Sequence, residues 1–271
     1  MSTAAPASGW APATSTTSPL LVADSWLVAD GAVRALDLHW ERFARSCARE
    51  GVDVAALRVA LATALPRRGR WFPRIELRAD GALRLDVRPA PGVAADVVVG
   101  WMFDAPDPRR APRRKGPDLE LLGTLREQAA AHGADEALLA DGEGRLLEGA
   151  YSSLLWWEGD ELWAVPDDAP ILPGITRRLL LALAGPAGVD VRFRRPAPAE
   201  LRSREVWLTS ALHGIRTLAP GGADDAPRAP VWRARLDALA RPLPGARPEG
   251  GVSPLSVSDR QTRHTPPRPR P

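Results

Sequence analysis

Residues 104–114, with the sequence DAPDPRRAPRR, interrupt the apolar pattern of the chain. Proline and charged residues dominate this segment and no apolar position recurs in it, which is typical of a connecting loop. On either side of the segment, stretches with helical spacing and stretches with alternating apolar residues follow one another. We therefore predict two folded units, residues 20–103 and 115–240, joined by the loop 104–114.

The smaller N-terminal unit is expected to begin with helices. In residues 36–50, apolar side chains from Trp40 to Cys47 recur with the spacing of one helical face, while arginines occupy other positions. Asp53 is expected to cap a second helix, which ends before Pro66.

The apolar pattern changes to a period of two in residues 74–88. Apolar side chains alternate on both sides of the pair Asp80-Gly81, and this pair is a typical turn sequence of a β-hairpin. Another apolar stretch at residues 97–102 predicts a further strand. The first unit is thus expected to be a small α+β domain.

The second unit is expected to be larger and also of the α+β class. Helices are predicted over residues 118–132, 176–184 and 231–240, with a short one near Ala199. Short strands are predicted at residues 137–139, 146–147, 154–157, 162–165, 189–193 and 206–209. Because strands and helices do not alternate strictly, an α+β fold is favoured over a doubly wound parallel sheet.

Both ends of the chain differ in composition from these units. Residues 1–19 are mainly alanine, serine, threonine and proline, and residues 241–271 are mainly proline, arginine, glycine and serine. Such segments bury too little apolar surface to offset the entropy lost on ordering, so we expect disordered tails. No signal-peptide pattern is present, and the longest apolar run, residues 179–184, is too short to cross a bilayer. We expect a cytoplasmic protein without a membrane partner.

Charge, cysteine content and motifs exclude several functional classes. The net charge is only +3 and part of the basic excess lies in the C-terminal tail, so no nucleic-acid partner is expected. The single cysteine, Cys47, and four scattered histidines give no metal-ligand spacing, so no metal is expected. The sequence contains no HExxH, GxSxG or CxxC motif, and Gly116 stands where a P-loop needs serine or threonine.

Lys115 is the only lysine among the 36 basic residues of the chain. Arginine supplies every other basic side chain, so the retained lysine indicates a need for a primary amine. A guanidinium stays protonated and forms no stable imine, whereas an amine with a lowered pKa attacks carbonyl groups. The positive charges of Arg113 and Arg114 would lower that pKa. Lys115 is therefore the leading candidate for a catalytic residue, at the start of the second unit.

Four short motifs follow Lys115 in a fixed order. They are GADEALL at 133–139, DGEG at 141–144, EG at 148–149 and LPGITR at 172–177. Together with Lys115 they resemble the class IV aminotransferase family, the fold-type IV pyridoxal-phosphate enzymes that include branched-chain and D-amino acid aminotransferases and aminodeoxychorismate lyase. The resemblance extends from residue 35 to residue 218. It implies a two-domain α+β fold like that of D-amino acid aminotransferase.

The resemblance also implies roles for individual residues. Lys115 would bind pyridoxal 5'-phosphate as a Schiff base, and Glu148 stands at the family's spacing for the acid beneath the pyridine nitrogen. Ser152 follows this acid, as a small hydroxyl residue does in many members. Arg42, three residues after His39, matches the arginine that binds the cofactor phosphate.

A physical argument supports a phosphate site at the LPGITR motif. Its proline and glycine form a turn into a helix, whose first free amides, at Ile175 and Thr176, favour an anion. Arg42 would complete this site. Ser210, at the end of a predicted strand, would add a hydroxyl or an amide.

The substrate is expected to be a small amino compound. Arg74, Arg109 and Arg110 are candidates to bind its carboxylate, because a guanidinium offers two parallel hydrogen bonds. A protonated pyridine ring would stabilise a carbanion at the substrate α-carbon, and Lys115 would move the proton as base and acid. The resemblance also implies a homodimer.

Three functions remain open. The segment TSALHGIR at 209–216 looks more like the lyase branch, which favours an aminodeoxychorismate-lyase-like β-elimination of pyruvate from an amino substrate. The first alternative is a transaminase that moves an amino group between a branched-chain or D-amino acid and a 2-keto acid. Ser153 stands where the family usually has asparagine, and the second alternative is a catalytically silent member that acts as a binding protein.

Overall fold

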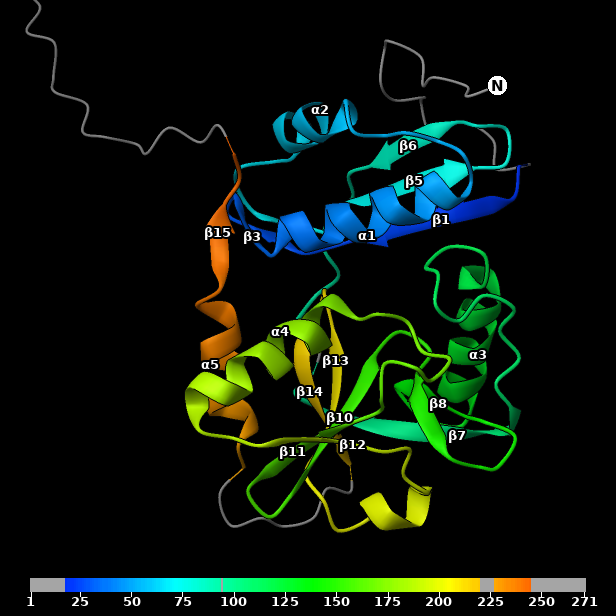
Figure 1. Cartoon of the computed structure of the whole chain (residues 1–271), viewed down its shortest axis with the longest axis vertical. Helices are drawn as coiled ribbons and strands as arrows, with labels where there is room; N and C mark the ends of the chain where they lie inside the picture. The colour runs from blue at the N-terminus through cyan, green and yellow to red at the C-terminus, as the bar shows by residue number, and fades with distance from the viewer. Residues whose placement is uncertain (1–17, 94, 220–226, 245–271) are drawn as a thin grey trace, which may run out of the picture.

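The computed structural model describes residues 18–93, 95–219 and 227–244 (Figure 1). Three β-sheets occur within these residues, of three, four and eight strands. In the view of Figure 1, helices α1 and α2 lie in an upper layer with the smaller sheets, and the large sheet forms the lower body with α3, α4 and α5. The predicted α+β class is confirmed.

Helix α1 (Leu36–Arg49) packs on the three-stranded sheet of the upper layer. This sheet has the order β1-β5-β6, with β1 at Leu20–Ser25, β5 at Arg74–Arg78 and β6 at Leu83–Asp86. The predicted hairpin is present, because β5 and β6 pair antiparallel. The predicted apolar stripe of the helix is also buried: Phe43 and Cys47 lie in one core cluster with Ile75 and Leu77.

Helix α2 (Leu57–Ala64) begins later than the sequence pattern predicted. Asp53 does not cap it. The Asp53 carboxylate instead accepts a hydrogen bond from the amide of Ala55, at 2.9 Å, in the turn before the helix. The residue at the N-cap is Ala56, which has no side-chain cap. The predicted cap is therefore wrong, because an aspartate can form a local turn as readily as it caps a helix.

The four-stranded sheet joins the two ends of the described chain. Its order is β15-β3-β2-β4, with β15 at Ala240–Pro242, β3 at Ala32–Arg34, β2 at Val28–Ala29 and β4 at Arg70–Trp71. The tail predicted from residue 241 thus begins too early, because β15 pairs with β3 and Leu243 is buried in the upper core. The rest of both predicted tails, residues 1–17 and 245–271, lies outside the described residues.

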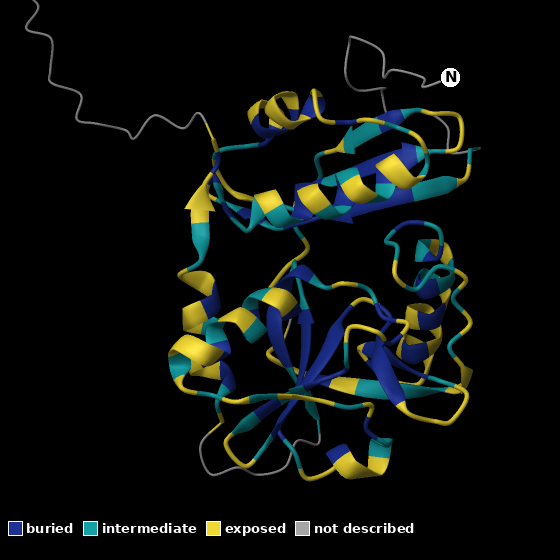
Figure 2. Cartoon of the chain, viewed as in Figure 1, coloured by how far each residue is buried: buried dark blue, intermediate teal, exposed yellow. Residues whose placement is uncertain are grey.

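The eight-stranded sheet has the order β12-β11-β10-β13-β14-β7-β8-β9. A further pairing of β10 with β9 closes the six strands from β10 to β9 into a ring. The strands are β7 (Val97–Pro106), β8 (Glu136–Ala140), β9 (Leu146–Gly149), β10 (Ser153–Glu158), β11 (Glu161–Ala164), β12 (Val191–Phe193), β13 (Val206–Ser210) and β14 (Gly214–Ala219). Figure 2 shows the strands at its centre as largely buried.

Helices cover this sheet and bury aromatic side chains against it. Helix α3 (Leu119–Ala131) contacts β8, and helices α4 (Ile175–Ala184) and α5 (Ala229–Asp237) contact β13 and β14 respectively. Short 3₁₀ turns lie at Gly185–Ala187 and Pro198–Leu201. Trp157 and Trp207 of the sheet pack against Trp232 of α5, and because all three side chains are buried, this cluster is a major part of the core.

Strand β7 corrects the predicted division of the chain. We assigned residues 97–102 to the first unit, but β7 pairs in parallel with β14 and with β8 inside the large sheet. The connection between the two layers therefore precedes Val97 instead of lying at 104–114. An apolar run suits a strand of either unit, and its pattern does not reveal which strands it will pair with.

Within the described ranges, no helix combines the length and apolar content needed to span a membrane. The same residues include no cluster of three or more histidine, cysteine, aspartate or glutamate side chains placed to bind a metal ion.

Candidate active site

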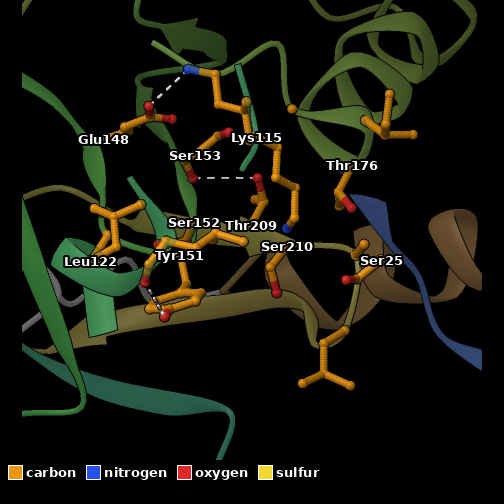
Figure 3. Close-up of a pocket in the computed structure, with 18 of the residues that line it drawn as sticks. Ser25, Lys115, Leu122, Glu148, Tyr151, Ser152, Ser153, Thr176, Thr209 and Ser210 are labelled. Carbon is orange, nitrogen blue, oxygen red and sulfur yellow. Dashed lines mark hydrogen bonds between the residues drawn. The ribbon is translucent and has the colours of Figure 1, made fainter. Parts of the chain in front are cut away.

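A cavity of about 420 Å³ is lined by residues of both layers (Figure 3). The upper layer contributes side chains from β1, α1 and β5. The lower layer contributes the segment after β7, the β9–β10 turn, the start of α4 and the end of β13. Most of the residues predicted from the sequence line this cavity, namely Lys115, Arg42, Glu148, Ile175, Thr176, Ser210, Arg74 and Arg109.

Lys115 lies where the lower layer touches β1 of the upper layer. Its carbonyl oxygen accepts a hydrogen bond from the amide of Ala23, at 2.8 Å. The next residue, Gly116, has φ +146°, and a Cβ atom there would lie 2.8 Å from the Cα atom of Val22. Only glycine tolerates both this backbone conformation and this close approach. The peptide unit between Lys115 and Gly116 is therefore packed tightly against β1.

The amine of Lys115 points into the cavity, toward Ser25, Thr176 and Ser210 in Figure 3. Among the described residues no side chain or carbonyl forms a hydrogen bond or ion pair with it. Burial and the positive charge of Arg42 lower the pKa of Lys115 to about 8, although Asp24 opposes the shift. A large share of the amine is thus unprotonated, and nucleophilic, slightly above neutral pH.

Arg42 is held in place by a buried carboxylate. Its Nε and Nη2 atoms donate to the two oxygens of Asp24, both at 2.8 Å, and its Nη1 atom donates to the carbonyl of Pro173 at 2.9 Å. Burial alone would raise the pKa of Asp24, but Arg42 and His39 hold it well below its usual range. The Nδ1 atom of His39 lies 2.8 Å from Asp24, so a single acid orients both side chains. Arg42 thereby links α1 to the loop that precedes α4.

The start of α4 provides free hydrogen-bond donors at the same cavity. Gly174 is the N-cap and no side chain caps the helix. Within the described chain, the amides of Ile175 and Thr176 donate to no other group. A Cβ atom at position 174 would lie 2.4 Å from the hydroxyl oxygen of Ser153, so a larger residue there would force that hydroxyl to move. Free amides at the positive end of a helix dipole favour a phosphate or carboxylate.

Glu148 is buried, and an arginine contacts it. The Nη1 atom of Arg109 donates to Oε1 of Glu148 at 2.6 Å, and the amide of Leu172 donates to the same oxygen at 2.8 Å. Burial raises the pKa of Glu148 to about 7, while Arg109 acts in the opposite direction. The carboxyl group can thus hold or release a proton near neutrality.

The guanidinium of Arg109 is already bound to groups of the protein, in contrast to the substrate-binding role predicted from the sequence. Its guanidinium also donates to Asp107, at 2.7 Å, and to the carbonyl of Pro170, at 3.2 Å. These contacts and the pair with Glu148 leave its side chain 4% exposed. We therefore propose that Arg109 orients Glu148 instead of binding a substrate carboxylate.

The other two arginines predicted to bind the substrate carboxylate, Arg74 and Arg110, differ in whether they line the cavity. Arg74 lines the cavity and forms an ion pair of 2.6 Å with Glu76. Arg110 is exposed and lies outside the lining, although its amide donates to Asp118 at 3.1 Å. Arg110 is thus no longer a candidate for substrate binding. Ser210 lines the cavity and its hydroxyl accepts a hydrogen bond from the amide of His213, at 3.2 Å.

Sequence reasoning missed two residues at or beside the cavity. Asp24, which orients Arg42, is an acid within the apolar run LLVADS, and that context could have marked it. Tyr151, the only tyrosine of the chain, follows the acid and lines the cavity. Together the residues form a nucleophilic amine, an anion cradle and a buried acid around one volume, which suits covalent binding of an aldehyde that carries a phosphate.

Comparison with known proteins gives one family match. The family model "Amino-transferase class IV" matches residues 21–219. No curated protein matches the chain in sequence.

Several solved structures are similar to the chain. A hypothetical aminotransferase from Mycobacterium tuberculosis, in its apo form, is 22% identical with a TM-score of 0.69, over 80% of this chain and 87% of that one. A branched-chain aminotransferase from Thermoproteus uzoniensis with norvaline is 19% identical with a TM-score of 0.68, over 80% and 83% of the two chains. A putative 4-amino-4-deoxychorismate lyase from Legionella pneumophila is 17% identical with a TM-score of 0.66, over 80% and 90%. These similarities show a shared fold.

Proposed function

The chain belongs to the amino-transferase class IV family, and from this premise we propose that it is an aminodeoxychorismate-lyase-like enzyme in which Lys115 is the catalytic residue. Membership in this family makes the protein a pyridoxal-phosphate-dependent enzyme. The proposed reaction is β-elimination of pyruvate from a small amino substrate. One observation carries the residue assignments: the Lys115 amine, the Glu148 carboxyl and the start of α4 line the same cavity.

The side chains present fit pyridoxal 5'-phosphate. Within the described chain the buried amine of Lys115 has no partner, so it is free to bind the aldehyde carbon of the cofactor. The free amides of Ile175 and Thr176, together with the Arg42 guanidinium, suit the phosphate dianion. Glu148 suits a pyridine nitrogen that carries a proton. We propose that these residues and the Ser210 hydroxyl hold the cofactor.

The bound cofactor supplies an electron sink for negative charge at the substrate α-carbon. Lys115 would take the proton from this carbon as a base and later return a proton as an acid. Its pKa of about 8 suits both roles near neutral pH. Glu148, oriented by Arg109 and the Leu172 amide, would keep a proton at the ring nitrogen.

The lyase reading is supported by the wall of the cavity. The segment that resembles the lyase branch, residues 209–216, contributes Thr209, Ser210, His213 and Arg216 to the lining. Its side chains would therefore face the substrate. Elimination needs one substrate only, which leaves as pyruvate and an aromatic amine.

Amino transfer is the second candidate. It uses the same amine at Lys115 and the same proton transfer at the substrate α-carbon, and it is the reaction for which the matching family is named. It differs in requiring a 2-keto acid as the second substrate. A homodimer and a cytoplasmic location remain predictions from the sequence.

Product analysis of the full chain with added pyridoxal phosphate separates these functions. Pyruvate released from aminodeoxychorismate without any keto acid supports the lyase. A new amino acid that forms only when a 2-keto acid is present supports the transaminase. A protein that carries the cofactor on Lys115 and shows neither product is the catalytically silent binding protein.

A further inference from the structure

The turn between β13 and β14 forms part of the cavity wall near the amine of Lys115. The residues from Ser210 to His213 all line the cavity. The two strands pair as far as Ser210 and Gly214, and the amide of His213 donates to the Ser210 hydroxyl within the turn. The position of the Ser210 side chain at the cavity therefore depends on how the whole turn is held.

A side chain of the upper layer holds this turn. The Nη2 atom of Arg34 donates to the carbonyl of Ala211 at 3.2 Å. Arg34 is the last residue of β3, and side chains alternate along a strand, so Val33 lies in the upper core while Arg34 extends from the opposite face. The guanidinium of Arg34 thereby connects the upper layer to the turn of the lower body.

A glycine leaves room for this guanidinium beside the turn. Gly214 has φ +67°, and a Cβ atom there would lie 3.2 Å from the Nη1 atom of Arg34. Glycine adopts this backbone conformation without strain and permits the close approach. The sequence at the end of the turn is thus suited to a guanidinium packed against it.

The two layers pack closely around Arg34. They leave a gap of only about 10 Å³, lined by Arg34, Trp26 and His39 from above and by Thr176 and Ala211 from below, among other residues. Arg34 does not line the large cavity, and it lies behind the wall of that cavity, beside the start of α4. A residue at this place can act on the site only through the backbone and side chains that it holds.

The C-terminal segment supplies the acid that directs Arg34. The Nη1 atom of Arg34 donates to Asp237 of α5 at 2.8 Å. Strand β15 follows α5, and its residue Ala240 pairs with Arg34, which brings the end of the helix to β3. Figure 1 shows α5 in the lower body and β15 beside the upper layer, both in orange.

The pair of Arg34 and Asp237 contributes more to direction than to stability. The Asp237 side chain is 70% exposed, and an ion pair with so exposed a partner stabilises a fold little. Asp237 is also the last residue of α5, where the helix dipole disfavours a negative charge. Burial lowers the pKa of Arg34, and Asp237 opposes that shift. The acid thus fixes one side of the guanidinium, while the other side binds Ala211.

Building on the proposed function, we infer that Arg34 is a positioning residue of the cofactor site. It holds the turn after β13 from the opposite layer, so that the Ser210 hydroxyl stays at the cavity beside the start of α4. Asp237 sets the direction of Arg34. The segment of α5 and β15 therefore takes part in cofactor binding, although none of its residues lines the cavity.

Comparison of pyridoxal phosphate with pyridoxal tests this inference, because the two compounds differ in the phosphate group. The cofactor-free full chain is titrated with each compound, and fluorescence measures the affinity. Arg34→Gln should weaken binding of pyridoxal phosphate about fivefold, the effect of roughly one lost hydrogen bond, and leave pyridoxal binding unchanged. An equal loss for both compounds, or no loss for either, would overturn the inference.

Arg233 of α5 offers a matched control. Its Nε atom donates to the carbonyl of Ile215 on β14 at 2.9 Å, and its Nη1 atom pairs at 2.8 Å with Asp96, which is as exposed as Asp237. Arg233→Gln removes the same two kinds of contact from the same hairpin, away from the cavity. Its stability in urea should fall about as much as that of Arg34→Gln, while its affinity for pyridoxal phosphate stays unchanged. Equal losses of affinity in both variants would contradict the positioning role.

Asp237→Asn provides a milder test that keeps Arg34 and suits the case in which Arg34→Gln folds poorly. Amide hydrogen exchange in the turn 211–213 should be faster in Asp237→Asn and in Arg34→Gln than in the wild type, and unchanged in Arg233→Gln. This measurement uses the cofactor-free protein, so it does not depend on the proposed reaction. Exchange at the wild-type rate in Asp237→Asn would contradict the role given to the C-terminal segment.

The inference and the proposed function fail in different ways. A wild-type protein that takes up no pyridoxal phosphate, seen as no visible absorbance, contradicts the proposed function, on which the positioning role rests. A wild-type protein that binds the cofactor, with Arg34→Gln indistinguishable from Arg233→Gln, contradicts only the positioning role.

Discussion

Arg109 and Glu148 form a buried ion pair, with 2.6 Å between Nη1 and Oε1 and 4% exposure of each side chain. Burial and the charge of Arg109 together determine the pKa of the Glu148 carboxyl group. Burial raises the pKa of Glu148 to about 7, and Arg109 prevents a larger rise. The carboxyl group of Glu148, which lines the cavity, therefore titrates near neutral pH.

Replacing Glu148 should separate cofactor binding from catalysis. Glu148→Gln keeps the shape of the side chain and removes its ability to ionise, so kcat should fall by about a hundredfold or more while the cofactor still binds Lys115. Steady-state kinetics and the mass of the reduced cofactor–protein adduct measure the two effects. Full activity in this variant would show that Glu148 has no role in the chemistry.

Removing the acid that orients Arg42 should weaken phosphate binding. Asp24→Asn cannot hold both guanidinium nitrogens as a charged acceptor, and affinity for pyridoxal phosphate should fall about tenfold. Fluorescence titration of the cofactor-free protein measures this affinity. Asp37→Asn is the control, since Asp37 lies exposed on α1, the helix that carries Arg42, and pairs with Arg58. An affinity equal to that of the control would mean that Arg42 needs no positioning residue.

The rate of cofactor uptake should depend on pH with a midpoint near 8. Burial and Arg42 lower the pKa of Lys115 to about 8 from 10.5, so the reactive neutral amine grows with pH up to that value and levels off above it. Arg88 also lowers this pKa, hence Arg88→Gln should move the midpoint upward. Stopped-flow absorbance of the cofactor-free protein gives the profile. A rate that keeps rising to pH 10 would contradict the lowered pKa.

A substitution beside Lys115 should destabilise the fold. Gly116→Ala combines a positive φ with a Cβ atom 2.8 Å from the backbone of Val22, and it should lower the free energy of unfolding by about 2 kcal/mol or more. Gly142→Ala is the control, because a Cβ atom there meets nothing within 4 Å. Urea unfolding of both variants measures the difference, and equal stability would mean that the Lys115 peptide is not tightly packed on β1.

Local patterns predicted those parts of the fold that depend on neighbours in sequence. The stripe from Trp40 to Cys47 specifies α1, and the alternation around Asp80-Gly81 specifies the hairpin β5–β6. Pairing between distant strands could not be predicted in this way. β7 joins β14 and β8, which lie far from it in the sequence, and the same holds for the pairing of β15 with β3.

For the candidate site too, the sequence predicted individual residues but not the contacts between distant elements. Lys115 was marked by its chemistry, and it lines the cavity together with Glu148 and Thr176, which follow it in the family's order. The partners of Arg109 and Arg42 could not be read from the sequence, because each lies on a separate element and only folding brings them together.

Borohydride reduction followed by peptide mass mapping tests most directly whether Lys115 binds the cofactor. The chain has one lysine, so the alternative attachment sites that complicate such maps in most proteins are absent from its side chains. The wild-type protein with pyridoxal phosphate should turn yellow and, after reduction, carry the cofactor mass on the peptide that contains Lys115, whereas Lys115→Ala should do neither. A wild-type protein that stays colourless, or a Lys115→Ala variant that retains the same adduct and activity, would contradict the account.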